Sequence, residues 1–181
     1  MSRIGSNFEG NIRPIQMLDA EASAAHRDSD DPSCEAGLAP GTQVLTLDGV
    51  IPVEFLNPGD RVLTRNGART LQSIVRHILP EGTQRIRVAS DALGGKPTGE
   101  TILMPSQRVL IRDWRAKAIW GKDVAAVPIA RLVDGTAIRT ETEGRQTMLS
   151  LYLGSPEILY ADGLELASAD PVEVPAPTKA G

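Results

Sequence analysis

Short apolar runs alternate with turn-forming pairs about every eight to twelve residues between Gly37 and Ser168, and this cadence limits the possible folds more than any other feature. Runs such as QVLTL, RVLT and QRVLIRD are separated by turn signals that include NPGD, RNG and DG. Helical spacing is weak and never extends beyond about two turns. The pattern therefore predicts an all-β domain, either a sandwich or a barrel.

The apolar runs also place the individual elements. We expect strands in QVLTL, VIPVEF, RVLT, TLQSIVRHI, QRIRVAS, ETILM, QRVLIRD, TMLSLYL and EILYADGLELAS. The pairs Asp48-Gly49 and Asp162-Gly163 are predicted to be two-residue hairpin turns. Two short helices are predicted in DWRAKAIWG and PIARLVDG, because each combines a capping residue or proline start, an apolar spacing of three to four, and a closing glycine.

The two ends of the chain have a different composition from the middle. Residues 1–36 are polar and acidic, as in DAEASAAHRDSDDPS, and they bury too little apolar surface to offset the entropy of ordering. We expect a disordered N-terminal arm there. Residues 169–181 alternate proline with small residues and predict a disordered tail. The sequence thus predicts one domain over residues 37–168.

Composition excludes several partners and cofactors. A net charge of −4 with scattered arginines provides no basic stripe for nucleic acid, and RIRV is interpreted as a strand face with solvated charges. One cysteine and two histidines do not supply a disulfide framework or a metal cluster, and we expect no cofactor. No stretch is apolar enough for a membrane span or a signal peptide. We therefore expect a soluble protein, either cytoplasmic or exported without a cleavable signal.

Four longer motifs follow one another between Gly37 and Ser168. They are GLAPGTQVLTLDGVIPVEFLNPGDRVLTRNG, MPSQRVLIRDWRAKAIWG, VPIARLVDGTAIR and LYLGSPEILYADGLELAS. In this order they resemble the Hint domain, which Hedgehog autoprocessing modules and inteins share, and in particular its compact bacterial branch. The resemblance implies a β-rich, horseshoe-shaped disk with pseudo-twofold symmetry and one or two short helices.

The resemblance also implies a chemistry, but the reactive positions carry other residues here. In this family the thiol of the first residue attacks the preceding peptide bond to form a thioester, and a histidine protonates the leaving nitrogen. The cysteine of a CFTPGT-like block corresponds to Gly37, which has no side chain. The serine and histidine of an SPQHR-like block correspond to Met104 and Gln107, and an amide cannot transfer a proton at neutral pH. The two histidines of the late block correspond to Ser150 and Pro156.

Cys34 is the alternative nucleophile, because it lies three residues before Gly37. Three extended residues span about 10 Å, whereas attack requires the reacting atoms within about 3–3.5 Å of each other. We therefore expect Cys34 to belong to the arm. The negative charges of Asp30, Asp31 and Glu35 should discourage its thiolate there.

The remaining polar candidates have structural interpretations. His77 is predicted to be a packed or surface residue of a strand, and Asp113 a helix cap. Asp162 is interpreted as a hairpin or cleft residue, and Arg108 as a member of a structural pair or a polar contact of the cleft. The two tryptophans lie six residues apart, too far for one helical face, and are predicted to anchor the outer layer.

Two functions are compatible with this pattern. The first is a catalytically degenerate Hint scaffold retained as a folded carrier or protein-interaction domain. The second is an autoprocessing domain with residual self-cleavage beside Gly37 or Cys34. The first is favoured, because loss of a general acid alone costs about 10²–10⁴ in rate and four reactive positions have changed. The family positions are expected to converge around one cleft: Gly37, Thr42, Met104, Gln107 and Pro156.

Overall fold

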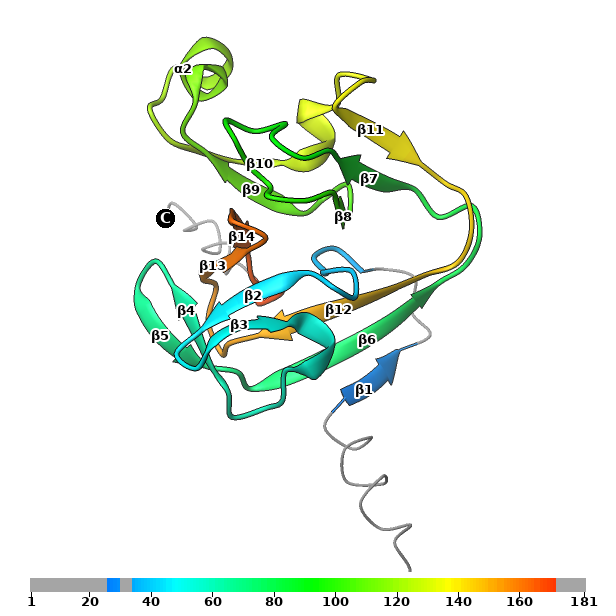
Figure 1. Cartoon of the computed structure of the whole chain (residues 1–181), viewed down its shortest axis with the longest axis vertical. Coiled ribbons are helices and arrows are strands. Elements are labelled where there is room, and N and C mark those ends of the chain that lie inside the picture. The colour runs from blue at the N-terminus through cyan, green and yellow to red at the C-terminus, as the bar shows by residue number, and fades with distance from the viewer. Residues whose placement is uncertain (1–25, 30–33, 172–181) are drawn as a thin grey trace, which may run out of the picture.

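The computed structural model describes residues 26–29 and 34–171, and nearly all of the regular structure in them is β (Figure 1). The strands are β1 (His26–Ser29), β2 (Gln43–Thr46), β3 (Gly49–Pro52), β4 (Arg61–Thr64), β5 (Gly67–Thr70), β6 (Ser73–Leu79), β7 (Arg85–Val88), β8 (Thr101–Leu103), β9 (Arg108–Ile111), β10 (Ala125–Pro128), β11 (Ile138–Glu141), β12 (Gln146–Tyr152), β13 (Ile158–Ala161) and β14 (Leu164–Ala167). The helical elements within these described residues are α2 (Trp114–Trp120) and two 3₁₀ turns, η1 (Val53–Phe55) and η2 (Ile129–Leu132).

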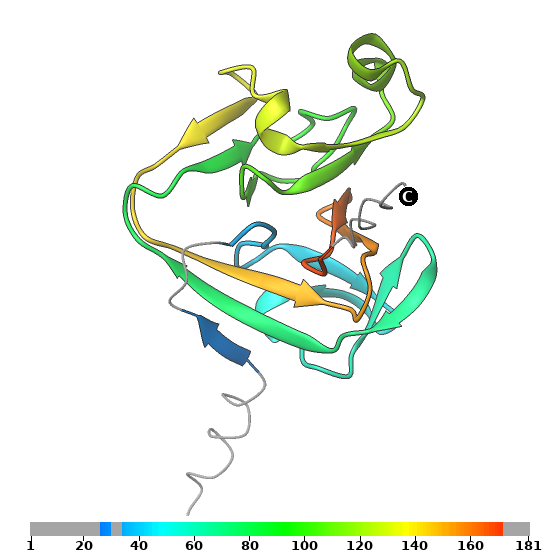
Figure 2. The same ribbon diagram turned by 180° about the vertical axis from the view of Figure 1, so that it is seen from behind.

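The strands form two lobes joined along one side. The largest sheet has the order β10-β9-β14-β13-β2-β4-β5, with β3 paired to β2, so it runs through both lobes. Strand β12 pairs antiparallel with β6, and β11 pairs antiparallel with β7. Figures 1 and 2 show the chain passing from β6 to β7 and back from β11 to β12 along the same side. This open, two-lobed arrangement confirms the predicted all-β horseshoe.

Both lobes contain the same local unit, an antiparallel pair of strands whose second strand ends in a proline and is followed by a 3₁₀ turn. The units are β2-β3-η1 and β9-β10-η2. In the first, the backbone N–H of Val53 donates to the Thr42 carbonyl over 2.9 Å; in the second, Ile129 donates to Gln107 over the same distance. Thr42 and Gln107 therefore occupy equivalent places in the two halves, as expected for a pseudo-twofold fold.

Two tight turns share a Thr-x-Asp/Asn-Gly pattern. Thr46 accepts the N–H of Asp48 and donates its hydroxyl to the Gly49 carbonyl, and Thr64 makes the same two contacts with Asn66 and Gly67. Because Thr46 pairs with Gly49, the turn residues are Leu47 and Asp48. The predicted Asp48-Gly49 turn is therefore wrong by one residue. The side-chain bonds of the threonine define the turn, and a DG pair alone does not reveal them.

The second predicted turn and the first predicted helix are confirmed, whereas PIARLVDG and VIPVEF differ from their predictions. Ala161 pairs with Leu164, so Asp162-Gly163 is the two-residue turn that was predicted, with φ angles of 51° and 80°. Helix α2 begins after Asp113, whose carboxylate accepts the N–H of Arg115, and ends at Gly121. PIARLVDG forms only the 3₁₀ turn η2, and VIPVEF stops being a strand at Pro52.

The packed domain is wider than the predicted residues 37–168. Cys34 is buried at its start, and the carboxylate of Asp170 accepts the N–H groups of Leu153 and Gly154 near its end. Strand β1, which was not predicted, pairs in parallel with β6. The arm and tail predictions otherwise fall on residues 1–25, 30–33 and 172–181, outside the described residues.

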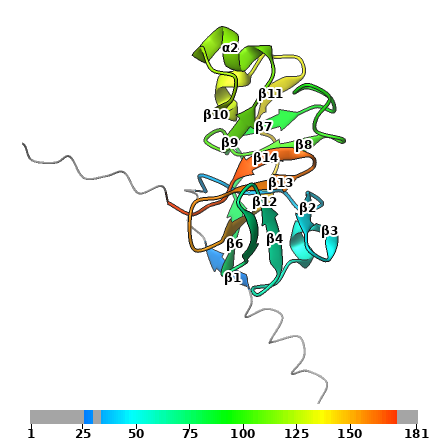
Figure 3. The ribbon, with the colours of Figure 1, turned by 90° about the vertical axis from the view of Figure 1, so that its left-hand side faces the viewer.

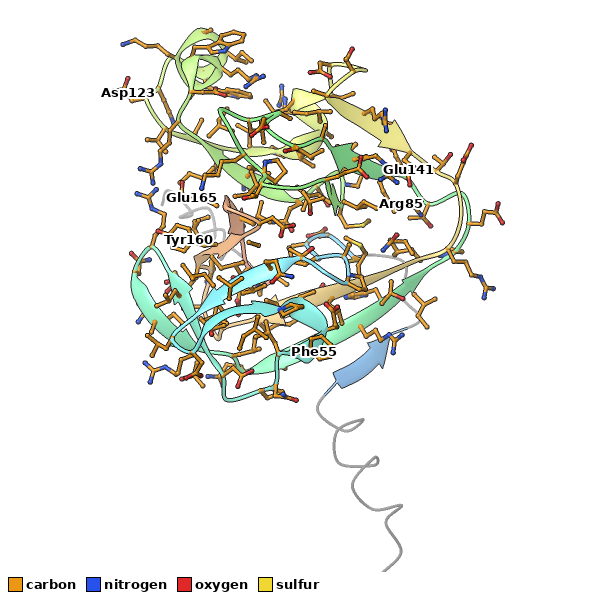
Figure 4. All side chains as sticks on the ribbon, viewed as in Figure 1. Phe55, Arg85, Asp123, Glu141, Tyr160 and Glu165 are labelled. Carbon is orange, nitrogen blue, oxygen red and sulfur yellow. The ribbon has the colours of Figure 1, made fainter. Side chains whose placement is uncertain are left out.

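A continuous hydrophobic core fills both lobes, with Leu56, Val62 and Ile74 in one and Ile86 and Ile129 in the other. Full burial of such side chains contributes about 1.5–3 kcal/mol each. Where β7 meets β11, the guanidinium of Arg85 is 1% exposed and contacts Glu141 (Figure 4). The same guanidinium donates to the Gly144 carbonyl over 2.9 Å. It thereby holds the turn between β11 and β12.

Candidate functional site

The segment from Cys34 to Leu38 lies against β12 and the loop before β9. Leu38 and Leu149 exchange two backbone hydrogen bonds of 2.9 and 2.8 Å, which fixes the segment beside β12. The hydroxyl of Ser106 donates to the Glu35 carbonyl over 2.6 Å. Gly37 is consequently held next to Ser150, and the MPSQ loop closes over the segment from the other side.

A side chain at Gly37 would be crowded by its neighbours. A Cβ added there would lie 2.8 Å from the sulfur of Cys34 and 3.1 Å from the Cβ of Met148. The backbone of Gly37 is not in the left-handed region, so crowding alone opposes a side chain there. The thiol of Cys34 therefore fills the volume in which a side chain of residue 37 would begin. The placement of Cys34 in an extended arm is wrong, because the chain bends at Glu35 and Ala36.

The Cys34 thiol belongs to a buried polar chain. Its sulfur lies 3.6 Å from the hydroxyl oxygen of Ser150, which lies 3.0 Å from the Nε2 of His77 and donates to the Ala36 carbonyl over 2.5 Å. Cys34 and His77 are 5% and 7% exposed. Burial raises the pKa of the Cys34 thiol, and the hydrogen bond with Ser150 only partly opposes this effect. The thiol is therefore protonated at neutral pH. The burial of His77 makes it a packed residue of β6, as predicted.

Gln107 lies on the same side of the domain as Gly37. Its side chain is buried, and its amide nitrogen donates to the carbonyls of Ala167, over 3.0 Å, and Arg108, over 3.2 Å. Gln107 and Gly37 also line one small cavity, of about 10 Å³, together with Ser168. The amide thus holds β14 to the start of β9, and its nitrogen is turned toward backbone carbonyls.

The expected convergence of the family positions is partial. Met104 packs with Cys34 and Met148 in a small second cluster, so Gly37, Met104, Gln107 and Ser150 do meet in one region. Thr42 lies at the corresponding place in the other half and lines a different pocket, with Gly99 and Asp162. Pro156 is on an exposed loop. We refer to Cys34, Gly37, Gln107 and Ser150 as the Gly37 corner.

A second buried polar cluster was not predicted. Glu157 is 7% exposed and accepts hydrogen bonds from Arg69 and Asn66, both over 2.8 Å, and from Thr64 over 3.4 Å. Burial opposes ionisation of this carboxyl, but the bonds from Arg69 and Asn66 outweigh burial and lower its pKa. The Thr-x-Asn-Gly turn and the glutamate after Pro156 were the available sequence signals. We call these four residues the Glu157 corner.

Arg108 and Asp162 have different outcomes. Arg108 is exposed and forms no ion pair with the described residues; it lines a groove beside β10, in the lobe that contains β7 to β11, which we call the upper lobe. Asp162 accepts the backbone N–H of Gln43 over 2.9 Å, which ties the β13–β14 turn to β2.

Among residues 26–29 and 34–171, no three His, Cys, Asp or Glu side chains converge as metal ligands. No helix in this part of the chain is long and apolar enough to cross a membrane.

The fold resembles solved intein structures. The solution structure of a bacterial intein-like domain from Clostridium thermocellum superimposes with a TM-score of 0.52, at 17% identity over 76% of this chain and 100% of that domain. The crystal structure of the TvoVMA intein gives a TM-score of 0.54, at 12% identity over 76% of this chain and 100% of that intein. These likenesses define the class of fold, that of inteins and intein-like domains.

The sequence itself defines the family. The Hint domain family matches residues 36–173, which is most of the chain. The protein therefore belongs to the Hint domain family, as the motifs between Gly37 and Ser168 indicated. A comparison with functionally curated proteins gave no significant match.

Proposed function

We propose that this Hint domain has lost the thiol-initiated self-processing of its family and serves as a folded module that binds another protein. The observation that carries the proposal is the packing at Gly37. The reactive side chain is absent, and the sulfur of Cys34 occupies its place at 2.8 Å from the position of a Cβ. An acyl shift at residue 37 has no nucleophile, so the covalent route has no first step.

The proton-transfer partner of the reaction is missing as well. Gln107 stands at the family's histidine position, and its amide nitrogen already donates to two backbone carbonyls. A leaving amide nitrogen needs a proton, and a glutamine amide cannot supply one at neutral pH. The scaffold around these positions is nevertheless complete, with a continuous core and a fully hydrogen-bonded Glu157. This combination favours a structural or binding role.

A second candidate function is self-cleavage by Cys34, and the chain of contacts from its sulfur to His77 favours it. The thiol would add to the carbonyl carbon of Ser33, and the Ser33–Cys34 C–N bond would break. The thiol proton would pass through Ser150 to the Nε2 of His77, once the Ser150 hydroxyl turns from the Ala36 carbonyl toward the imidazole. The nitrogen of Cys34 would take up one proton and become an amine, so no net proton is gained or lost. The resulting Ser33 thioester would pass to water or an added thiol. The raised pKa of Cys34 opposes this route, because the thiol is the weaker nucleophile.

Intact-mass measurement separates the two functions. We expect the full chain, incubated at neutral pH with and without a millimolar thiol, to keep its full mass, and Cys34→Ala to behave identically. Thiol captures thioesters, so an unchanged mass reports that none forms. Release of a fragment ending at Ser33, abolished in Cys34→Ala, would replace the proposal with the second candidate. Release of a fragment ending at Ala36 would also overturn the proposal.

A further inference from the structure

Strand β10 forms one end of the largest sheet and leaves its outer edge open. Within the described residues it pairs only with β9. Figure 3 shows β10 below α2, in the lobe that also contains β7, β8, β9 and β11. A groove of about 470 Å³ runs along it, lined by Arg108, Trp120, Lys122, Val124, Ala125, Ala126, Val127, Pro128 and Arg131. An open strand edge beside a groove can accept an additional strand.

The register of β10 shows which backbone groups face outward. Ile129 donates its N–H to the Gln107 carbonyl, in register with the Val127–Val109 and Ala125–Ile111 pairs. In an antiparallel ladder, hydrogen-bonded pairs alternate with pairs whose backbone groups face away. Ala126 therefore turns both its N–H and its carbonyl toward the open edge. These are the two groups that an added strand would engage.

The groove is positively charged although the chain as a whole is negative. Arg108, Lys122 and Arg131 line it, and none of them forms an ion pair with a described residue. No aspartate or glutamate is among its lining residues. The adjacent Asp123 lies near Lys117 on α2, at 3.7 Å, and projects outward from the upper lobe (Figure 4). The field along β10 consequently favours a ligand with negative charges.

The groove also offers apolar contact. Trp120, the last residue of α2, is partly buried beside it, and the side chain of Val124 is 41% exposed. An aromatic ring next to an open strand edge provides a flat surface for alternate side chains of an extended peptide. A nucleic acid would use the cations but has no backbone N–H and carbonyl to match those of Ala126.

We propose that the groove binds an acidic peptide segment in an extended conformation, which adds as a strand to β10 at Ala126 and places its carboxylates near Arg108, Lys122 and Arg131. This inference rests on the proposed role as a protein-binding module and names the chemistry of the partner. The backbone hydrogen bonds with Ala126 would orient the bound peptide along β10. The cations would select acidic sequences over basic ones and speed association at low salt.

The test uses the full chain and a fluorescein-labelled peptide in which glutamate alternates with valine. Fluorescence anisotropy should show saturable binding that weakens with salt, and a peptide with lysine in place of glutamate should not bind. Lys122→Glu with Arg131→Glu should weaken binding by about tenfold or more. The matched control is Arg61→Glu with Arg145→Glu, which changes the net charge equally at exposed sites outside the groove. Equal losses in the two pairs would overturn the proposal.

A second measurement tests the strand pairing. Bound peptide should slow amide hydrogen exchange at Ala126, because its N–H would become hydrogen-bonded. Ala126→Pro should weaken binding, whereas Ala126→Val, which keeps the N–H, should bind like the parent chain. Unchanged exchange at Ala126, or tighter binding of a single-stranded oligonucleotide of equal charge, would overturn the proposal. Failure here with an intact chain mass would leave the loss of self-processing standing, so the two proposals can fail separately.

Discussion

The Gly37 corner and the Glu157 corner are both buried and polar, and they differ in what holds their polar groups. At the Gly37 corner the groups are neutral: a thiol, a hydroxyl and an amide, which contact one another, the His77 ring or backbone carbonyls. At the Glu157 corner a carboxylate is held by the side chains of Arg69, Asn66 and Thr64. Residues 150–157 supply Ser150 to the first corner and Glu157 to the second.

This difference indicates which of the two corners depends on charge for its stability. Charge-assisted hydrogen bonds are stronger than neutral ones, and they are lost when the carboxylate is protonated. Neutral contacts in a tight space depend instead on shape, because a single added carbon meets other atoms. The Glu157 corner should therefore respond to pH, and the Gly37 corner to the size of the side chains placed there.

The largest expected effect is thiol-dependent cleavage introduced at the Gly37 corner. Gly37→Cys alone would crowd the sulfur of Cys34, so the replacement should be made together with Cys34→Ala. Adding Gln107→His to this pair should accelerate thiol-dependent cleavage after Ala36 by about 10²–10⁴, because an imidazole can protonate the leaving nitrogen. Intact mass against time gives the rates. Equal rates with Gln107 and with histidine at that position would show that the proton donor is not what is missing.

A smaller effect is expected at the Glu157 corner. Glu157→Gln removes a charge that three side chains stabilise and should lower the free energy of unfolding at pH 7 by about 2 kcal/mol. The folded-state pKa of Glu157 lies below its ordinary value, so this stabilisation is present above about pH 4.3 and is lost as the pH falls through the folded pKa. Urea unfolding of both chains between pH 3 and 7 measures it. A difference that stays constant over this range would contradict the charge-based account.

The neutral contacts of Gln107 should contribute less. Gln107→Met keeps the length of the side chain and removes two donated hydrogen bonds, so we expect a loss of about 1 kcal/mol with no dependence on pH between 3 and 7. The same urea titrations provide the measurement. A loss as large as that of Glu157→Gln would mean that the two corners are held equally strongly.

Much of the fold could be predicted from the sequence. The runs QVLTL, RVLT, QRVLIRD and TMLSLYL are strands, and Asp113 and Gly121 bound helix α2, because these signals are local. Strands β1, β5, β10 and β11 were missed. GART and AAVP have weak strand propensity and are strands because β4 and β9 pair with them, which is a tertiary effect.

The site was predicted less completely. Family motifs placed Gly37, Met104 and Gln107 in one region, as the structure has them, but the same motifs also placed Thr42 and Pro156 there, and these two residues lie elsewhere. The position of Cys34 depends on a bend at Glu35 and Ala36 that composition does not indicate, and an extended-chain estimate therefore put the thiol too far away. Glu157 was missed because its partners come from a turn far away in the sequence.

The central claim is that Cys34 fills the space of the absent side chain at Gly37, and a double-mutant cycle tests it most directly. Gly37→Ala should cost about 1–2 kcal/mol in the parent chain, because the new Cβ would meet the sulfur of Cys34 at 2.8 Å. In a Cys34→Ala background the same substitution should cost about 1 kcal/mol less, with the 3.1 Å approach to Met148 accounting for the remainder. Equal costs of Gly37→Ala in the two backgrounds, measured by urea unfolding, would contradict the account.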